Sequence, residues 1–191
     1  MSFCNNVIIV DANYIDKVAF NLIVNFERML ERRIQPADMG HWLDCVALDG
    51  GMKPGDNKVQ VIFLYDKSSE LENFKPCRLE EDLNAHAFKS SLGEFSLEVH
   101  KVESQFTNIS DYFVESLEVL LDDKGVEKII VVPDAETYSR KVVNALSGTD
   151  KDITLLAMEP LTGGGFKQQI LGYSLMSALN IRADELRFDT I

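Results

Sequence analysis

Short apolar runs of strand character alternate with helical segments along this chain, and this alternation limits the folds open to it. Residues 6–10, Asn-Val-Ile-Ile-Val, form an unbroken, largely β-branched run, which is typical of a strand buried on both faces. A second such run lies within 127–134. Helical spacing of apolar residues follows in 14–33 and again in 135–146. The pattern predicts an α/β fold with a mostly parallel sheet and helices on both faces.

The remaining segments extend this prediction. Further strands are expected at 42–51, 58–66, 94–102 and 152–158. The first two flank a turn-rich stretch and are compatible with a hairpin. Further helices are expected at 78–88, 107–125 and 166–180. No repeat or linker divides the chain, so residues 1–191 are expected to form one domain.

The net charge of −12 argues against a protein that binds nucleic acid through a broad basic face. Acidic residues number 31 and basic residues 19, and no run of Lys and Arg occurs. If RNA is a partner, it is therefore expected to bind weakly. The three cysteines, Cys4, Cys45 and Cys77, are widely spaced and form no Cys-x-x-Cys pair, which disfavours a zinc site built from thiolates.

Membrane association is not expected. No apolar run approaches the roughly 20 residues that cross a bilayer. The opening Met-Ser-Phe-Cys-Asn-Asn lacks the basic and apolar regions of a signal peptide. Together with the few cysteines, these features favour a cytoplasmic location.

Acidic residues follow both buried runs. Asp11 and Asn13 follow the first run, and Asp134 and Glu136 follow the second. Taken singly, Asp11 or Asp134 is explained as a helix N-cap, and Asp111 as an acid favoured by a helix dipole. Parallel sheets, however, bind ligands beyond the carboxyl ends of their strands, where these side chains would meet. Carboxylates that converge repel one another unless a cation neutralises them, and oxygen ligands suit Mg²⁺ or Mn²⁺.

Two stretches resemble the NYN domains of the PIN-like nuclease superfamily. Residues 7–13, Val-Ile-Ile-Val-Asp-Ala-Asn, resemble their opening strand, an aliphatic run followed by Asp and then Asn. Residues 127–146 resemble their second signature, an aliphatic strand followed by Ser-Gly-Asp-Ser-Asp-Phe and a helix. Residues 109–121 occupy the place of their Lys-Gly-Val-Asp helix. The resemblance implies a Rossmann-like fold and, in active members, metal-dependent cleavage of RNA.

Five polar residues match the acids and the Asn of these motifs: Asp11, Asn13, Asp111, Asp134 and Glu136. The chain also departs from the motifs. Val132 and Pro133 replace Ser and Gly, Thr137 stands in place of Phe, and no Lys precedes the helix acid. These departures bear on substrate handling and catalysis more than on fold.

Three functions follow as hypotheses. In the first, the chain is a metal-dependent endoribonuclease: Asp11, Asp111 and Asp134 are catalytic and bind Mg²⁺ or Mn²⁺, while Asn13 and Glu136 assist at the substrate. In the second, it is a catalytically degenerate PIN-like module that binds a partner through the same residues. In the third, it is a nucleotide-binding Rossmann-like protein that binds an anion at the Thr-Gly-Gly-Gly stretch of 162–165. A homo-oligomer is compatible with each hypothesis.

Overall fold

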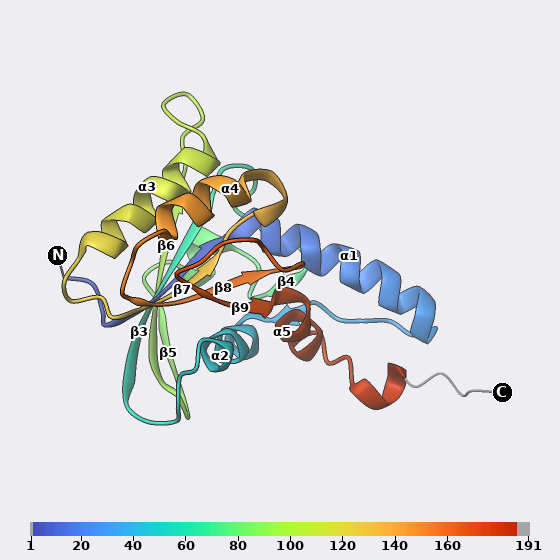
Figure 1. Ribbon diagram of the computed structural model, residues 1–191. Helices are drawn as coiled ribbons and strands as arrows, with labels where there is room; N and C mark the ends of the chain where they lie inside the picture. Colours follow the sequence, from blue (N-terminus) through green and yellow to red (C-terminus); the bar gives the residue numbers. More distant parts are fainter. Residues whose placement is uncertain (1, 187–191) are drawn as a thin grey trace.

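The computed structural model describes residues 2–186 as a seven-stranded sheet with helices on both faces (Figure 1). The strand order is β5-β6-β3-β1-β7-β8-β9, and all neighbours pair in parallel except β5 with β6. The strands are β1 (Asn6–Asp11), β3 (Asn57–Tyr65), β5 (Ala87–Ser90), β6 (Gly93–Lys101), β7 (Lys128–Val132), β8 (Asp152–Ala157) and β9 (Lys167–Ile170). The short strands β2 (Ala37–Asp38) and β4 (Phe74–Lys75) pair separately. The predicted α/β fold with a mostly parallel, Rossmann-like sheet is therefore confirmed.

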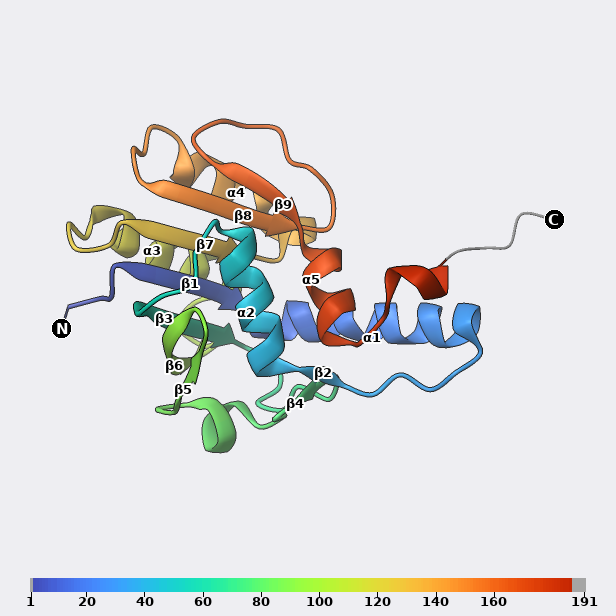
Figure 2. The ribbon, with the colours of Figure 1, turned by 90° about the horizontal axis from the view of Figure 1, so that it is seen from below.

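The helices form two layers, one on each face of the sheet. Helices α3 (Ile109–Asp122) and α4 (Ala135–Leu146) cover one face. Helices α1 (Ala12–Leu30), α2 (Met39–Asp49) and α5 (Leu171–Ala178) pack on the other (Figures 1 and 2). No helix within residues 2–186 is long and apolar enough to cross a membrane.

Strand β1 contributes to both cores because its side chains alternate. Val7 and Ile9 pack with α3 and α4, and Ile8 and Val10 pack with the opposite layer. The alternation places the side chain of Asp11 on the α3 and α4 side. This direction decides which helix the carboxylate meets.

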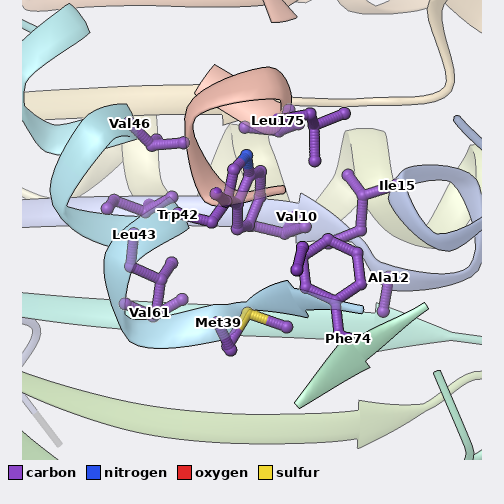
Figure 3. Packing of buried hydrophobic residues seen from close by; sticks show 14 of the residues in the cluster. Val10, Ala12, Ile15, Met39, Trp42, Leu43, Val46, Val61, Phe74 and Leu175 are labelled. Atoms are coloured by element: carbon purple, nitrogen blue, oxygen red, sulfur yellow. The ribbon is translucent and has the colours of Figure 1, made fainter. Parts of the chain in front are cut away.

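The predicted strand at 42–51 is wrong, because this segment belongs to α2. Trp42, Leu43 and Val46 recur at helical spacing and are buried beneath α5 and against β1 (Figure 3). The Nε1–H of Trp42 donates to Ser174 Oγ at 3.1 Å. A short apolar run fits a strand or a buried helix equally well, and packing decides between them. The hairpin with 58–66 is also wrong, since β3 pairs in parallel with β1 and β6.

Two further segments differ in part from the prediction. The expected helix at 166–180 begins with strand β9 and becomes helical only at Leu171. The expected helix at 78–88 is a single turn at Leu79–Leu83, followed by β5. The strands expected at 58–66, 94–102 and 152–158 are confirmed within a residue or two at each end.

Candidate functional site

The direction in which the sheet is built reverses between β1 and β7. The chain adds β3 and β6 on one side of β1 and then returns to add β7, β8 and β9 on the other. β1 and β7 pair in parallel from Asn6–Lys128 to Val10–Val132, so their carboxyl ends lie side by side. Open α/β sheets bind ligands at such a switch point. Asp11 ends β1 and Asp134 follows β7, and the predicted adjacency of these two strand ends is confirmed.

Asp11 is buried, with 4% of its surface exposed, and both of its carboxylate oxygens have protein partners. Oδ1 accepts the backbone N–H of Tyr14 at 3.2 Å, which makes Asp11 the N-cap of α1. Oδ2 accepts the hydroxyl of Tyr138 at 2.6 Å. Burial raises the pKa of Asp11 to about 6, the two hydrogen bonds oppose this rise, and repulsion from Asp134 and Asp66 adds to it.

Two buried tyrosines converge on these carboxylates. Tyr138 lies one turn after Asp134 on α4, and burial followed by the charge of Asp11 raises its pKa. Tyr14 is 3% exposed, and its pKa is raised by burial and then by the charges of Glu136 and Asp134. The Tyr14 hydroxyl has no hydrogen-bond partner among the described residues. Glu136 acts on this hydroxyl through its charge and through a side-chain interaction that falls short of hydrogen-bond geometry.

Asp134 is the N-cap of α4. Its Oδ1 accepts the backbone N–H groups of Glu136 and Thr137, each at 3.1 Å, and its Oδ2 accepts the Thr137 hydroxyl at 2.8 Å. Thr137 stands where the NYN signature has Phe, and here it completes the cap. Glu136 is exposed and makes a loose ion pair with Lys17, with 3.8 Å between Oε2 and Nζ.

Asn13 orders the loop that follows β3. Its Oδ1 accepts the backbone N–H groups of Asp66 at 3.2 Å and Lys67 at 3.0 Å, and its Nδ2 donates to the Ser68 carbonyl at 2.8 Å. Asn13 thus positions Asp66, and these three hydrogen bonds occupy both ends of its side-chain amide. We call Asp11, Asp66, Asp134 and Glu136 the acidic edge.

Asp111 lies outside this group of interacting charges. Its Oδ1 accepts Lys141 Nζ at 2.7 Å, and its Oδ2 accepts Asn108 Nδ2 at 2.7 Å. These two hydrogen bonds lower the pKa of Asp111. Asp111 and Lys141 line a shallow hollow between α3 and α4. A lysine of the chain itself therefore neutralises the third predicted metal ligand.

The donor set does not fit a preformed Mg²⁺ or Mn²⁺ site. Within residues 2–186, no three His, Cys, Asp or Glu side chains are placed to hold a metal ion together. The oxygens of Asp11 accept hydrogen bonds from Tyr14 and Tyr138, and Asp134 accepts three hydrogen bonds from its own helix. Carboxylates that bind metals commonly accept hydrogen bonds as well, so the feature missing from the described residues is a third ligand placed with Asp11 and Asp134.

The glycine-rich loop at 162–165 does not open a helix. It leads into β9, and α5 begins only at Leu171. Gly165 has a φ of +89°, and a Cβ there would lie 2.8 Å from the Leu146 carbonyl oxygen. The loop packs on the end of α4, so the helix N-terminus expected to bind an anion is not formed there.

Sequence reasoning missed three residues of the site. Asp66 follows β3 as Asp11 ends β1, so the same pattern of an apolar strand followed by an acid was available to identify it. Nothing in the sequence marked Tyr14 and Tyr138 as site residues, because a tyrosine on the apolar face of a helix is expected to be an ordinary core residue.

Comparison with known proteins gives one match. A family model described as "Family of unknown function (DUF6621)" matches residues 1–186. No curated protein and no solved structure matches the chain. The choice among the three functional hypotheses therefore depends on the geometry.

Proposed function

Because the chain belongs to the DUF6621 family, whose function is unknown, we propose from the geometry that it is a catalytically inactive PIN-like module that binds a positively charged ligand at the acidic edge. One observation carries this proposal. The central carboxylate, Asp11, is only 4% exposed and accepts a hydrogen bond from the protein on each oxygen, which leaves it little open surface for a catalytic metal. The acidic edge nevertheless brings four carboxyl groups together.

The charge of the acidic edge favours a cationic ligand. Asp134 and Asp66 both repel Asp11. The cation paired with Glu136 is Lys17, whose Nζ lies 3.8 Å from the carboxylate and whose side chain is more than half exposed. A bound cation relieves such repulsion. The buried hydroxyl of Tyr14 adds a polar group that lacks a partner among the described residues. The exposed carboxylate of Glu136 is a suitable acceptor for an ammonium N–H.

Titration with spermidine, a small linear polyamine, tests this proposal by calorimetry. We expect saturable binding to the wild type that weakens as salt is added, because exposed charges are screened. Asp134→Asn and Glu136→Gln should each weaken binding several-fold. Both substitutions preserve shape, and Asn is itself a good N-cap. Glu118→Gln, an exposed acid on α3, is the matched control and should bind as the wild type does. Equal binding by all four proteins would contradict the proposal.

A metal-dependent ribonuclease is the second candidate, and one observation favours it. Asp11 and Asp134 stand at adjacent strand ends, at the switch point where α/β enzymes place their sites. In such an enzyme Mg²⁺ or Mn²⁺ would supply an activated water and stabilise charge on the phosphate. Incubation of the protein with single-stranded RNA and Mn²⁺ distinguishes the candidates. Cleavage by the wild type that Asp134→Asn abolishes would support the nuclease and overturn the inactive module.

A further inference from the structure

A cavity of about 460 Å³ lies between α3 and the strands β3 and β6. The residues of the acidic edge do not line it. Ile62 and Leu64 of β3 line one side of it, and Val119 and Leu120 of α3 line the other. Phe3, from the segment before β1, closes one side. The volume falls within the range of small-molecule sites, roughly 300–1,000 Å³, and such sites are also lined mainly by apolar side chains.

The cavity arises from the way β6 alternates. Phe95, Leu97 and Val99 are buried on the face that carries α1 and α2. Glu98 and His100 turn to the α3 side, where they remain partly exposed. Helix α3 packs on β3 and leaves this polar side of β6 open. An apolar hollow with one polar wall is the result.

The polar wall is built around Gln60, which is only 7% exposed. Its Oε1 accepts the backbone N–H of Cys4 at 3.1 Å, and its Nε2 donates to Glu98 Oε1 at 2.8 Å. The second oxygen of Glu98 lies 3.4 Å from His100 Nε2. A buried amide is tolerated when it is hydrogen-bonded, and here it holds one carboxylate at the mouth of the cavity.

We propose that this cavity binds a small amphipathic amine. The hydrocarbon part of the ligand packs against Ile62, Leu64 and Leu120, and its ammonium group pairs with Glu98. A ligand that covers Glu98 removes water from the carboxylate, and this desolvation cost is offset only by an opposite charge. An ammonium group supplies that charge and forms charge-assisted hydrogen bonds to the carboxylate. Anionic ligands are disfavoured by Glu98 and by the net charge of −12.

Three probes with one hydrocarbon chain test the proposal: n-octylamine, n-octanol and octanoate. Calorimetry at pH 7.4, where the amine is protonated, should show saturable 1:1 binding of octylamine to the wild type. Octanol should bind at least about tenfold more weakly, because it lacks the charge-assisted contact. Octanoate should not bind. Absence of saturable octylamine binding, or equal affinity for all three probes, would overturn the proposal.

Two variants locate the site. Ser116→Trp places a large side chain in the cavity without removing a packed residue, and it should abolish octylamine binding. Glu98→Gln keeps an acceptor for Gln60 but removes the charge, and it should reduce the preference for the amine over octanol to near unity. Glu115→Gln, an exposed acid on α3 outside the cavity, is the matched control. Circular dichroism checks that each variant folds. If Ser116→Trp does not fold, the affinities of Glu98→Gln for octylamine and octanol alone test the proposal. Wild-type affinity in both variants would place the amine elsewhere and overturn the proposal.

Discussion

The hydroxyl of Tyr138 donates a hydrogen bond of 2.6 Å to Oδ2 of Asp11 inside the protein core. The two residues are 127 positions apart in the chain. The contact ties the N-cap of α1 to the first turns of α4, and Asp134 caps α4 one turn earlier. It also engages one of the two oxygens through which Asp11 could bind a metal. The stability of the fold and the chemistry open to Asp11 thus depend on the same hydrogen bond.

Tyr138→Phe should destabilise the protein more at pH 8 than at pH 4. The ring still packs against Phe113, at a centroid distance of 5.6 Å, so the change removes only the hydroxyl. Above pH 6, where Asp11 is ionised, loss of the donor should cost about 1–3 kcal/mol of unfolding free energy. Urea unfolding at both pH values measures the effect. An equal loss at the two pH values would contradict the assigned role.

The free energy of unfolding of Asp11→Asn should increase relative to that of the wild type as pH rises from 4 to 8. The pKa of Asp11 is about 6 in the folded protein against 3.8 for an ordinary Asp, so between these values the folded state holds a proton that the unfolded chain has lost. The stability that Asp11 contributes is therefore greatest below pH 4 and is lost as pH rises through 6. Asn does not titrate. The difference in unfolding free energy between variant and wild type should shift toward the variant by the order of 3 kcal/mol. A difference that stays constant with pH would disprove this.

Asp134→Asn should lower the pKa of Asp11, and Asp111→Asn should leave it unchanged. Asp134 repels the Asp11 carboxylate, whereas Asp111 is paired with Lys141 on the outer surface of α3 and α4. Carboxyl-carbon NMR titration of Asp11 in the three proteins measures this directly. Equal shifts in both variants would show that Asp111 belongs to the acidic edge after all.

Gly50→Ala should destabilise the protein through a clash with β7. Gly50 ends α2, and a Cβ there would lie 2.3 Å from Cδ1 of Ile130. Its φ of −74° suits any residue, so the cost is steric and should be about 1–3 kcal/mol. Ile130→Val removes Cδ1, the nearer of the two clashing atoms, and leaves Cγ1 at 2.7 Å, so the double variant should lose less stability than the sum of the single ones. Urea unfolding of the four proteins completes the cycle. Additive losses would exclude the clash as the cause.

The sequence by itself determined the elements whose signals are local. Residues 6–10 and 127–134 read as buried strands because an unbroken β-branched run fits a parallel sheet covered on both faces. The interpretation of Asp11 and Asp134 as N-caps was also available from the sequence, because a cap is a hydrogen bond to a residue only two or three positions away. The adjacency of the two strand ends was a prediction from the expected parallel sheet, and the pairing of β1 with β7 confirms it.

Only the tertiary structure decided what those local signals leave open. The apolar residues of 42–51 fit either a strand or a helix, and the burial of Trp42 beneath α5 selected the helix. The pairing of Asp111 with Lys141 depends on how α3 and α4 lie beside each other. The contact of Tyr138 with Asp11 depends on the side to which β1 turns its last residue and on the position of α4 above it. Each of these contacts joins segments distant in sequence, so its energy is gained only when the whole sheet and both helix layers have formed.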